Sequence, residues 1–558
     1  MKKNILKVAC LCAFLCLTAC EDFFNVTTDS MLDGNEYMKE SNEMYTGYIG
    51  LFSRLQVVAD KAIYLTDTRG DILTLTDKTP RELVNIYRYA DDLTDNSYAD
   101  PGGYYDVIIG CNDYLSKVRE FKDENVEIVD MNHYRALVSG TIRIKTWAYF
   151  MLGKIYGQAV WFDDPLVNVS DLSVYPLLNL DQIIDKCITY LNTGVDGVDG
   201  KLDMFSWEEW LKADQDDSSS TDEEVNNYQY WDLVTPPYFV LAADLHLWKG
   251  DNYWLVVDLI RTALNNSFLT KGDRIWNMGF YYNRYYAGIF DANIPYTDYS
   301  VFVLPYFSKK GQTNGLKRHF DIYDPNEGLL GVSTPEVMNR YWAQENNPMS
   351  DEQREKNGGD TRFRTFFNAN EKSTSQRDSL RLTKYFQPNS KTSVYRWDNP
   401  VSIYRSTELY LMLIEAYIHL GQFGRAKTLM NKGIATDYPE GKSDFTNWIA
   451  EGYTAGVWRA ASGFRSTYSL DDRTFEESMS EEALKKNDLQ ILDEYLLEFA
   501  AEGKNYATMI RMARRYNDYR IIADRVCPKY EVDGLSELVR SKLEKGEWFI
   551  PWNLRISK

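Results

Sequence analysis

The sequence has few of the residues on which enzymes and metal sites depend. Its four histidines, His133, His246, His319 and His419, are scattered and form neither an HExxH motif nor a Cys/His cluster. A GxSxG element, a P-loop and a GxGxxG turn are all absent from the sequence. Adjacent carboxylates occur, but neighbouring side chains on a helix or strand point apart. We therefore expect a protein that is not an enzyme and that binds no metal or cofactor.

Positive charge and long apolar runs are also scarce. The chain has 82 Asp and Glu against 62 Lys and Arg, a formal net charge of −20. This balance disfavours nucleic acids and anionic membrane surfaces as partners. Beyond the amino terminus, no uninterrupted run of about 18 apolar residues could cross a membrane.

Cysteine is rare outside the amino terminus. Of the seven cysteines, only Cys111, Cys187 and Cys527 follow residue 20. Because these three are odd in number and far apart, the sequence indicates no disulfide framework. We expect each of them to be a small buried apolar side chain.

The amino terminus has the pattern of a secretory signal. Lysines precede an apolar stretch over residues 8–17 that is too short for a mature transmembrane helix. The stretch ends in Leu17-Thr18-Ala19-Cys20, which resembles a bacterial lipobox with cleavage before Cys20. We expect a signal peptide over residues 1–19, lipidation of Cys20 and a polar tether over residues 20–35. An ordinary signal peptide with a chance cysteine is the alternative.

Helical periodicity dominates the rest of the chain. Residues 402–434 form an amphipathic segment, a break at Gly421 and a second amphipathic segment. This helical hairpin is of tetratricopeptide (TPR) type, and residues 238–264 repeat its pattern. A hairpin cannot bury its apolar face alone, so we expect several to stack. The expected helical ranges are about 36–60, 107–191, 238–264, 402–434 and 488–513.

Irregular segments interrupt these helices. Residues 62–79 and 98–105 have the composition of loops. Residues 268–401 lose the helical period and carry short strand-like runs such as 301–304. Because long irregular segments in compact proteins are usually functional, we interpret 268–401 as a ligand-binding insertion. The predicted fold is mainly α: a TPR-like hairpin scaffold with large loop-rich insertions and a few short strands, in one domain over residues 36–558.

An acidic run lies within a segment rich in Gly, Asp and Ser at residues 195–227. It includes Asp214, Asp216 and Asp217. The spacing does not match an EF-hand, so a solvated loop is the favoured interpretation. A structural calcium ion is left open there.

Aromatic residues are abundant, with 14 Trp, 41 Tyr and 25 Phe. Ring faces that are not used in the core can stack on sugars, while Asp, Asn and Arg hold hydroxyl groups. Three loops combine these residue types. The candidate ligand-binding residues are Asp67, Arg69, Asp71, Tyr98, Tyr104, Trp276, Tyr281, Tyr282, Arg284 and Tyr285. The alternative is that these side chains pack against the helical scaffold.

Several motifs, taken in order, resemble the SusD/RagB family of outer-membrane nutrient-binding lipoproteins. They are the lipobox at Cys20, residues 104–115, 143–165 and 238–264, Gly359-Asp360-Thr361-Arg362, Lys384-Tyr385, residues 403–416 and 493–511, and the closing Phe549-Ile550-Pro551. Each motif alone is weak, and the order of the motifs is what is specific. The departures, such as Tyr495 and Asn505, fall at positions that we interpret as structural.

The resemblance implies a cell-surface lipoprotein, held in the outer membrane by its lipid, that partners a TonB-dependent, SusC-like transporter in nutrient uptake. Acidic residues after the lipidated cysteine, here Glu21 and Asp22, resemble the surface-export signal of the family. The cargo is left open between an oligosaccharide, the favoured class, and an oligopeptide. A surface glycoside hydrolase is a further alternative, because 82 acidic residues could include a catalytic pair.

Overall fold

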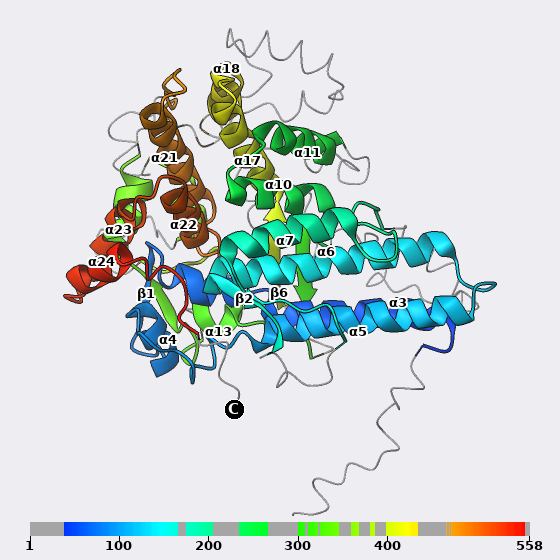
Figure 1. Cartoon of the computed structure of the whole chain (residues 1–558). Coiled ribbons are helices and arrows are strands. Elements are labelled where there is room, and N and C mark those ends of the chain that lie inside the picture. The colour runs from blue at the N-terminus through cyan, green and yellow to red at the C-terminus, as the bar shows by residue number, and fades with distance from the viewer. Residues whose placement is uncertain are drawn as a thin grey trace, which may run out of the picture.

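A computed structural model describes residues 38–165, 174–204, 234–265, 300–306, 311–321, 324–344, 359–367, 380–385, 398–432, 465, 468 and 470–552. This part of the chain is mainly helical, with a few short strands in small sheets, which confirms the predicted fold class (Figure 1). Cys111, Cys187 and Cys527 are buried free thiols, as expected. None of the described helices combines the length and apolar character that crossing a membrane would require.

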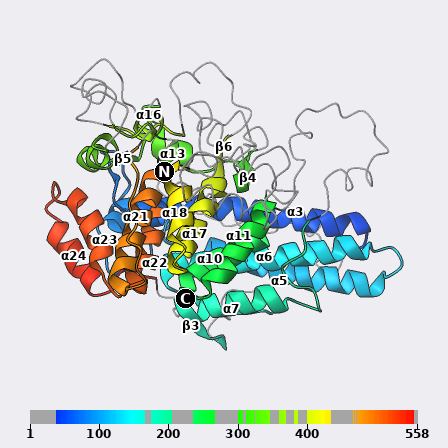
Figure 2. The same cartoon turned by 90° about the horizontal axis from the view of Figure 1, so that it is seen from above.

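The amino-terminal helices lie side by side (Figures 1 and 2). They are α3 (Ser41–Val58), α5 (Gly102–Glu124), α6 (Met131–Tyr156) and α7 (Leu180–Thr193). Helix α6 is buried along most of its length because it packs against α5 and α7. It ends at Gly157, whose φ of 70° is left-handed. A Cβ at this position would also lie 2.6 Å from the ring of Phe549, so only glycine fits.

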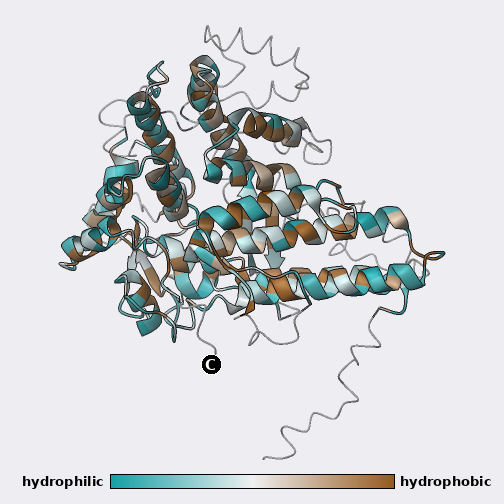
Figure 3. Cartoon of the chain, in the orientation of Figure 1, coloured by the Kyte–Doolittle hydropathy of each residue, from teal (hydrophilic) through white to brown (hydrophobic). Residues whose placement is uncertain are grey.

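Two further hairpins confirm the repeat that the sequence predicted. The first pairs α10 (Tyr238–Lys249) with α11 (Tyr253–Asn265), and the second pairs α17 (Ser406–His419) with α18 (Phe423–Lys427) and a π-helical turn (Thr428–Lys432). Gly250 and Gly421 adopt left-handed φ values of 73° and 70° in the two turns. Helix α11 packs on α17, which joins the hairpins. Hydrophobic residues follow the packed faces of these helices (Figure 3).

The carboxyl-terminal part forms another helical group. It contains α21 (Glu481–Glu498), α22 (Asn505–Arg515), α23 (Arg520–Val526), a 3₁₀ turn (Cys527–Tyr530) and α24 (Ser536–Glu544). The expected single helical range of 488–513 is therefore wrong in detail. Helix α21 ends at Glu498, and left-handed residues at Ala501 and Gly503 turn the chain before α22 begins.

Within the described residues, three small antiparallel sheets join separate segments of the chain. They pair β1 (Leu73–Leu75) with β5 (Leu330–Val332), β2 (Gln158–Val160) with β3 (Leu177–Asn179), and β4 (Ser300–Tyr306) with β6 (Asp398–Arg405). Strand β4 contains the predicted strand-like run. Shorter elements are α4 (Arg81–Tyr87), α13 (Leu316–Phe320), α14 (Thr334–Val337), α16 (Arg362–Phe366) and the π-helical turns Ile63–Asp67 and Met338–Trp342.

Three sequence-based boundaries need correction. Residues 62–79 are not loop throughout, because they contain a π-helical turn and β1. Helix α5 begins inside the expected loop at 98–105, where the side chain of Asp100 accepts the N–H of Gly102 at 2.8 Å. Residues 402–405 belong to β6 rather than to a helix, because they pair with a strand about a hundred positions earlier in the chain.

Candidate functional site

Asp67 and Arg69, but not Asp71, connect the amino-terminal part of the chain to its carboxyl-terminal part. All three side chains are buried. The carboxylate of Asp67 accepts the N–H of Gly503 at 2.7 Å, and burial raises the pKa of Asp67 to about 7. Nη1 of Arg69 donates to the carbonyl oxygen of Phe549 at 2.7 Å. These contacts hold the two ends of the chain together.

The other candidates that the structure describes also make internal contacts. Asp71 forms an ion pair with Arg340. The Tyr98 hydroxyl lies 3.2 Å from Nε2 of His319 in a hydrogen bond, and the side chain of Tyr98 is half-buried. Tyr104 is buried and donates to the carbonyl oxygen of Val58 at 3.4 Å. These side chains thus pack against the scaffold, which is the alternative that the sequence left open.

The remaining candidates, Trp276, Tyr281, Tyr282, Arg284 and Tyr285, lie outside the described residues, as does Cys20. Ligand contact by any of the candidate residues stays a prediction. The acidic run of residues 214–217 also lies outside the described residues, so the question of a calcium ion there stays open. Within the described ranges, no group of three or more His, Cys, Asp or Glu is arranged to hold a metal ion.

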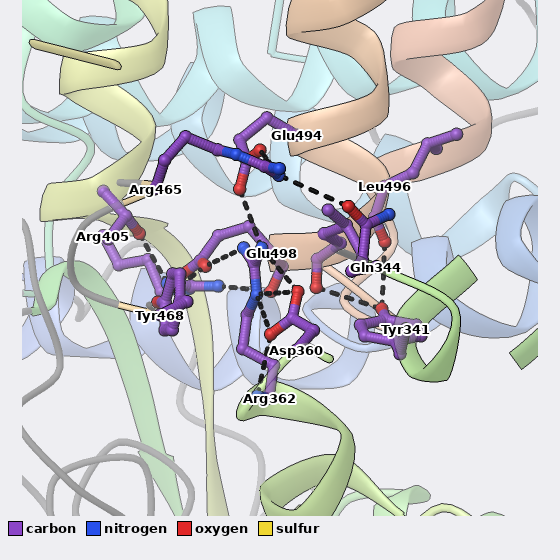
Figure 4. A network of polar contacts seen from close by, with 12 residues as sticks. Tyr341, Gln344, Asp360, Arg362, Arg405, Arg465, Tyr468, Glu494, Leu496 and Glu498 are labelled. Atoms are coloured by element: carbon purple, nitrogen blue, oxygen red, sulfur yellow. Dashed lines mark hydrogen bonds and ion pairs between the residues drawn. The ribbon is translucent and has the colours of Figure 1, made fainter. Parts of the chain in front are cut away.

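Motifs that are far apart in the sequence meet in one buried ion network (Figure 4). Arg362 lies at its centre: Nη2 donates to Asp360 at 2.8 Å and to Glu494 at 2.7 Å, and Nη1 donates to Glu498 at 3.0 Å. These four side chains have no exposed surface. The network therefore joins α16 to α21 in the interior.

A second cation extends the network toward β6 and the turn after α21. Nε of Arg405 donates to Glu502 at 2.9 Å, and Nζ of Lys384 donates to the same carboxylate at 2.8 Å. Glu494 and Glu498 lie one turn apart on α21, and Glu502 reaches the same network from the turn that follows the helix. The motif residues of 359–362, 384, 405 and 494–502 thus form a structural joint.

The charges of this joint are balanced against the cost of burying them. Burial alone would raise the pKa of Glu494, but Arg362, Arg465 and Arg473 outweigh it and lower the pKa to about 2. Burial likewise opposes ionisation of Glu502, but Arg405 and Lys384 lower its pKa to about 2. Both carboxylates are therefore ionised at neutral pH and accept hydrogen bonds from fixed cations.

A cleft of about 640 Å³ opens beside the carboxyl-terminal tail. Its walls come from the turn after α4, from β2 and β3, and from residues 546–552. Residues that give the cleft its chemistry are Arg69, Asp91, Asp92, Gln158, Phe549 and Trp552. Among the predicted ligand-binding residues that the structure describes, Arg69 alone lines it. This volume lies in the range of small-ligand sites.

Some polar groups of the cleft can accept hydrogen bonds, and another holds the carboxyl-terminal tail in place. A hydrogen bond from Lys542 lowers the pKa of Asp91, and hydrogen bonds from Thr94 lower that of Asp92, so both carboxylates are ionised at neutral pH. Nε2 of Gln158 donates to the carbonyl oxygen of Trp552 at 3.1 Å, which fixes the tail. A glycosidase acid needs a raised pKa, and the shifts of both aspartates go the other way.

Comparisons with known proteins identify the architecture. No family model matches the sequence, and no curated protein matches it. Solved structures do match: a SusD superfamily protein from Bacteroides vulgatus aligns with a TM-score of 0.61 at 11% identity, covering 91% of this chain and 93% of that one. Another, from Bacteroides thetaiotaomicron, aligns with a TM-score of 0.58 at 12% identity, covering 93% and 96%.

The chain has the SusD fold. A further solved structure with this fold is described as a laminarin-binding SusD-like protein; its TM-score is 0.57 at 12% identity, over 87% of this chain and 94% of that one. The resemblance that the sequence indicated is thus confirmed at the level of the SusD fold. In this chain, several of the motifs build the buried joint and the docked tail.

Proposed function

We propose that this protein is a cell-surface glycan-binding lipoprotein, held in the outer membrane by a lipid on Cys20, that passes its cargo to a TonB-dependent, SusC-like transporter without cutting it. The observation that carries the proposal is the SusD fold, shared over most of the chain with structures that include a laminarin-binding SusD-like protein. The lipobox supports the anchor, and the secretory signal supports export.

The cleft beside the tail is the glycan site that we propose. The rings of Trp552 and Phe549 supply apolar faces for the C–H side of a sugar, and both rings are half-buried. The carboxylates of Asp91 and Asp92, held ionised, accept hydrogen bonds from sugar hydroxyls. The candidate loop around Trp276 is a second proposed contact region.

The test is glycan binding by the protein without its signal peptide, measured by calorimetry with laminarin oligosaccharides and a panel of other glycans. Trp552→Ala removes one ring face, on the order of 80 Å² of apolar contact, which corresponds to about 2 kcal/mol and about a 30-fold weaker Kd. The matched control is Trp254→Ala, because Trp254 is 61% exposed on α11 and does not line the cleft. Equal binding by both variants would remove the cleft from the site.

The same preparation separates the alternative cargoes. Native mass spectrometry of the protein purified with its transporter should show bound glycan; co-purified oligopeptides alone would replace the glycan proposal with the peptide one. Incubation with the glycan panel should release no reducing ends. Sustained release that resists repurification would instead support a hydrolase.

A further inference from the structure

The turn between α5 and α6 exposes apolar side chains at the far end of the amino-terminal helices. Val126, Ile128 and Met131 are 63%, 60% and 42% exposed, while Val129 between them is buried and holds the turn down. Figure 3 shows this hydrophobic turn at the right-hand edge of the molecule. Large apolar side chains gathered on a protruding surface mark a contact with another apolar phase or partner.

The turn is held in a defined conformation. The side chain of Asp130 caps α6 by accepting the N–H groups of Asn132 at 2.8 Å and His133 at 3.1 Å. Met131 therefore begins a long, mostly buried helix and presents its side chain from a fixed position. The apolar surface is thus a built feature of the hairpin.

The chain enters the structure at this same end. The hydroxyl of Tyr45, near the start of α3, lies 2.7 Å from Nδ1 of His133 near the start of α6. The first described residue, Met38, is buried just before α3. Cys20 precedes Met38 by 18 residues, so a lipid on Cys20 lies at most about 65 Å from it. The tether that would carry the predicted anchor therefore joins the molecule at the end that bears the apolar turn.

We propose that the α5–α6 turn inserts Val126, Ile128 and Met131 into the interface of the membrane that holds the lipid on Cys20. The inference rests on the lipid anchor of the proposed function. Three apolar side chains bind a bilayer weakly alone, but tethering keeps them at a high local concentration beside it. Glu124 and Glu127 flank the turn, so zwitterionic lipid is favoured over anionic lipid. Lipid and turn together would then fix the orientation of the protein.

The experiment uses the full lipoprotein, purified from membranes and reconstituted into phosphatidylcholine vesicles. Ile128→Cys is labelled with an environment-sensitive fluorophore, which is selective because Cys111, Cys187 and Cys527 are buried. The matched control is Val532→Cys, because Val532 is 86% exposed and precedes α24, an element that Figure 1 shows at the opposite side of the molecule. Quencher-bearing lipids report direct contact of each label with the bilayer.

We expect a blue shift and about two-fold quenching by lipid at position 128, with neither at position 532. The substitutions Val126→Ser and Met131→Ser together should reduce the quenching of the label at position 128, while the protein still floats with the vesicles. Flotation without quenching at 128 overturns the proposal and leaves the anchor intact. A blue shift that lipid does not quench assigns the turn to a protein contact and also overturns it. Loss of flotation overturns the anchor and this inference together, whereas glycan binding tests the rest of the proposed function independently.

Discussion

Replacing Arg362 with methionine should destabilise the protein far more than replacing an arginine whose ion-pair partner is exposed. Methionine keeps much of the apolar volume but removes the cation at the centre of the network. Asp360, Glu494 and Glu498 are then left with less compensation in a site without exposed surface. Asp360 suffers most, because Glu494 retains Arg465 and Arg473.

The size of the effect follows from this burial. Breaking a buried ion pair by removing one partner costs about 3 to 5 kcal/mol. With an unfolding entropy of about 2.1 cal/mol/K per residue, a chain of this length shifts its Tm by about 1 °C per kcal/mol, so we expect a loss of about 3 to 5 °C. The measurement is differential scanning calorimetry at neutral pH. The control Arg514→Met removes a pair with Asp181, which is 74% exposed, and should cost less than about 1 kcal/mol.

Two results would refute this reasoning. If the Tm of Arg362→Met equals that of Arg514→Met within experimental error, the network does not stabilise the joint. If adding Asp360→Asn to Arg362→Met fails to recover part of the lost Tm, the cost does not come from an uncompensated carboxylate. Recovery is expected because the second substitution removes the buried charge that has lost its partner.

Three further predictions concern other parts of the molecule. Burial raises the pKa of Asp67 to about 7 in the folded protein, so the unfolded chain loses this proton first and the free energy of unfolding falls as pH rises from about 4 to 7. Between pH 4 and pH 8, the free energy of unfolding of Asp67→Asn, measured with urea, should rise by up to about 4 kcal/mol relative to that of the wild type. The same pH dependence in both proteins would contradict this prediction. Gly503→Ala should lower stability by at least about 1 kcal/mol, because φ is 75° and the new Cβ would lie 2.8 Å from that of Ala62; an unchanged urea midpoint would show that the turn can yield. Alanine at Trp276, Tyr281 and Tyr285 together should abolish glycan retention in affinity electrophoresis with an unchanged circular dichroism spectrum, and undiminished retention would exclude that loop from the site.

The sequence predicts the hairpins well because their signals are local. Apolar spacing and the glycines at 250 and 421 lie within the segments that they organise. The strand at 402–405 was mistaken for helix because its conformation depends on pairing with β4. Periodicity carries no information about such a distant partner.

The chemistry of the candidate site was harder to predict. Arg69 and Phe549 are 480 positions apart, and only the folded chain brings them to one cleft. Asp67 and Asp71 looked suited to ligand binding by residue type, yet their burial gives them internal partners. The motifs that contain Asp360, Arg362 and Arg405 were the signal of the ion network, but their spacing in the sequence does not show that these side chains meet.

The docked carboxyl-terminal tail, residues 546–552, has a consequence for how the chain folds. The N–H of Ile550 donates to the carbonyl oxygen of Ile155 at 2.9 Å, and the ring of Phe549 covers Gly157. These contacts join residues almost 400 positions apart in the sequence, so the packing around Gly157 is complete only after residues 549 and 550 have folded back onto it. A stop codon just before Trp548 would remove both contacts and leave this end of α6 without its cover.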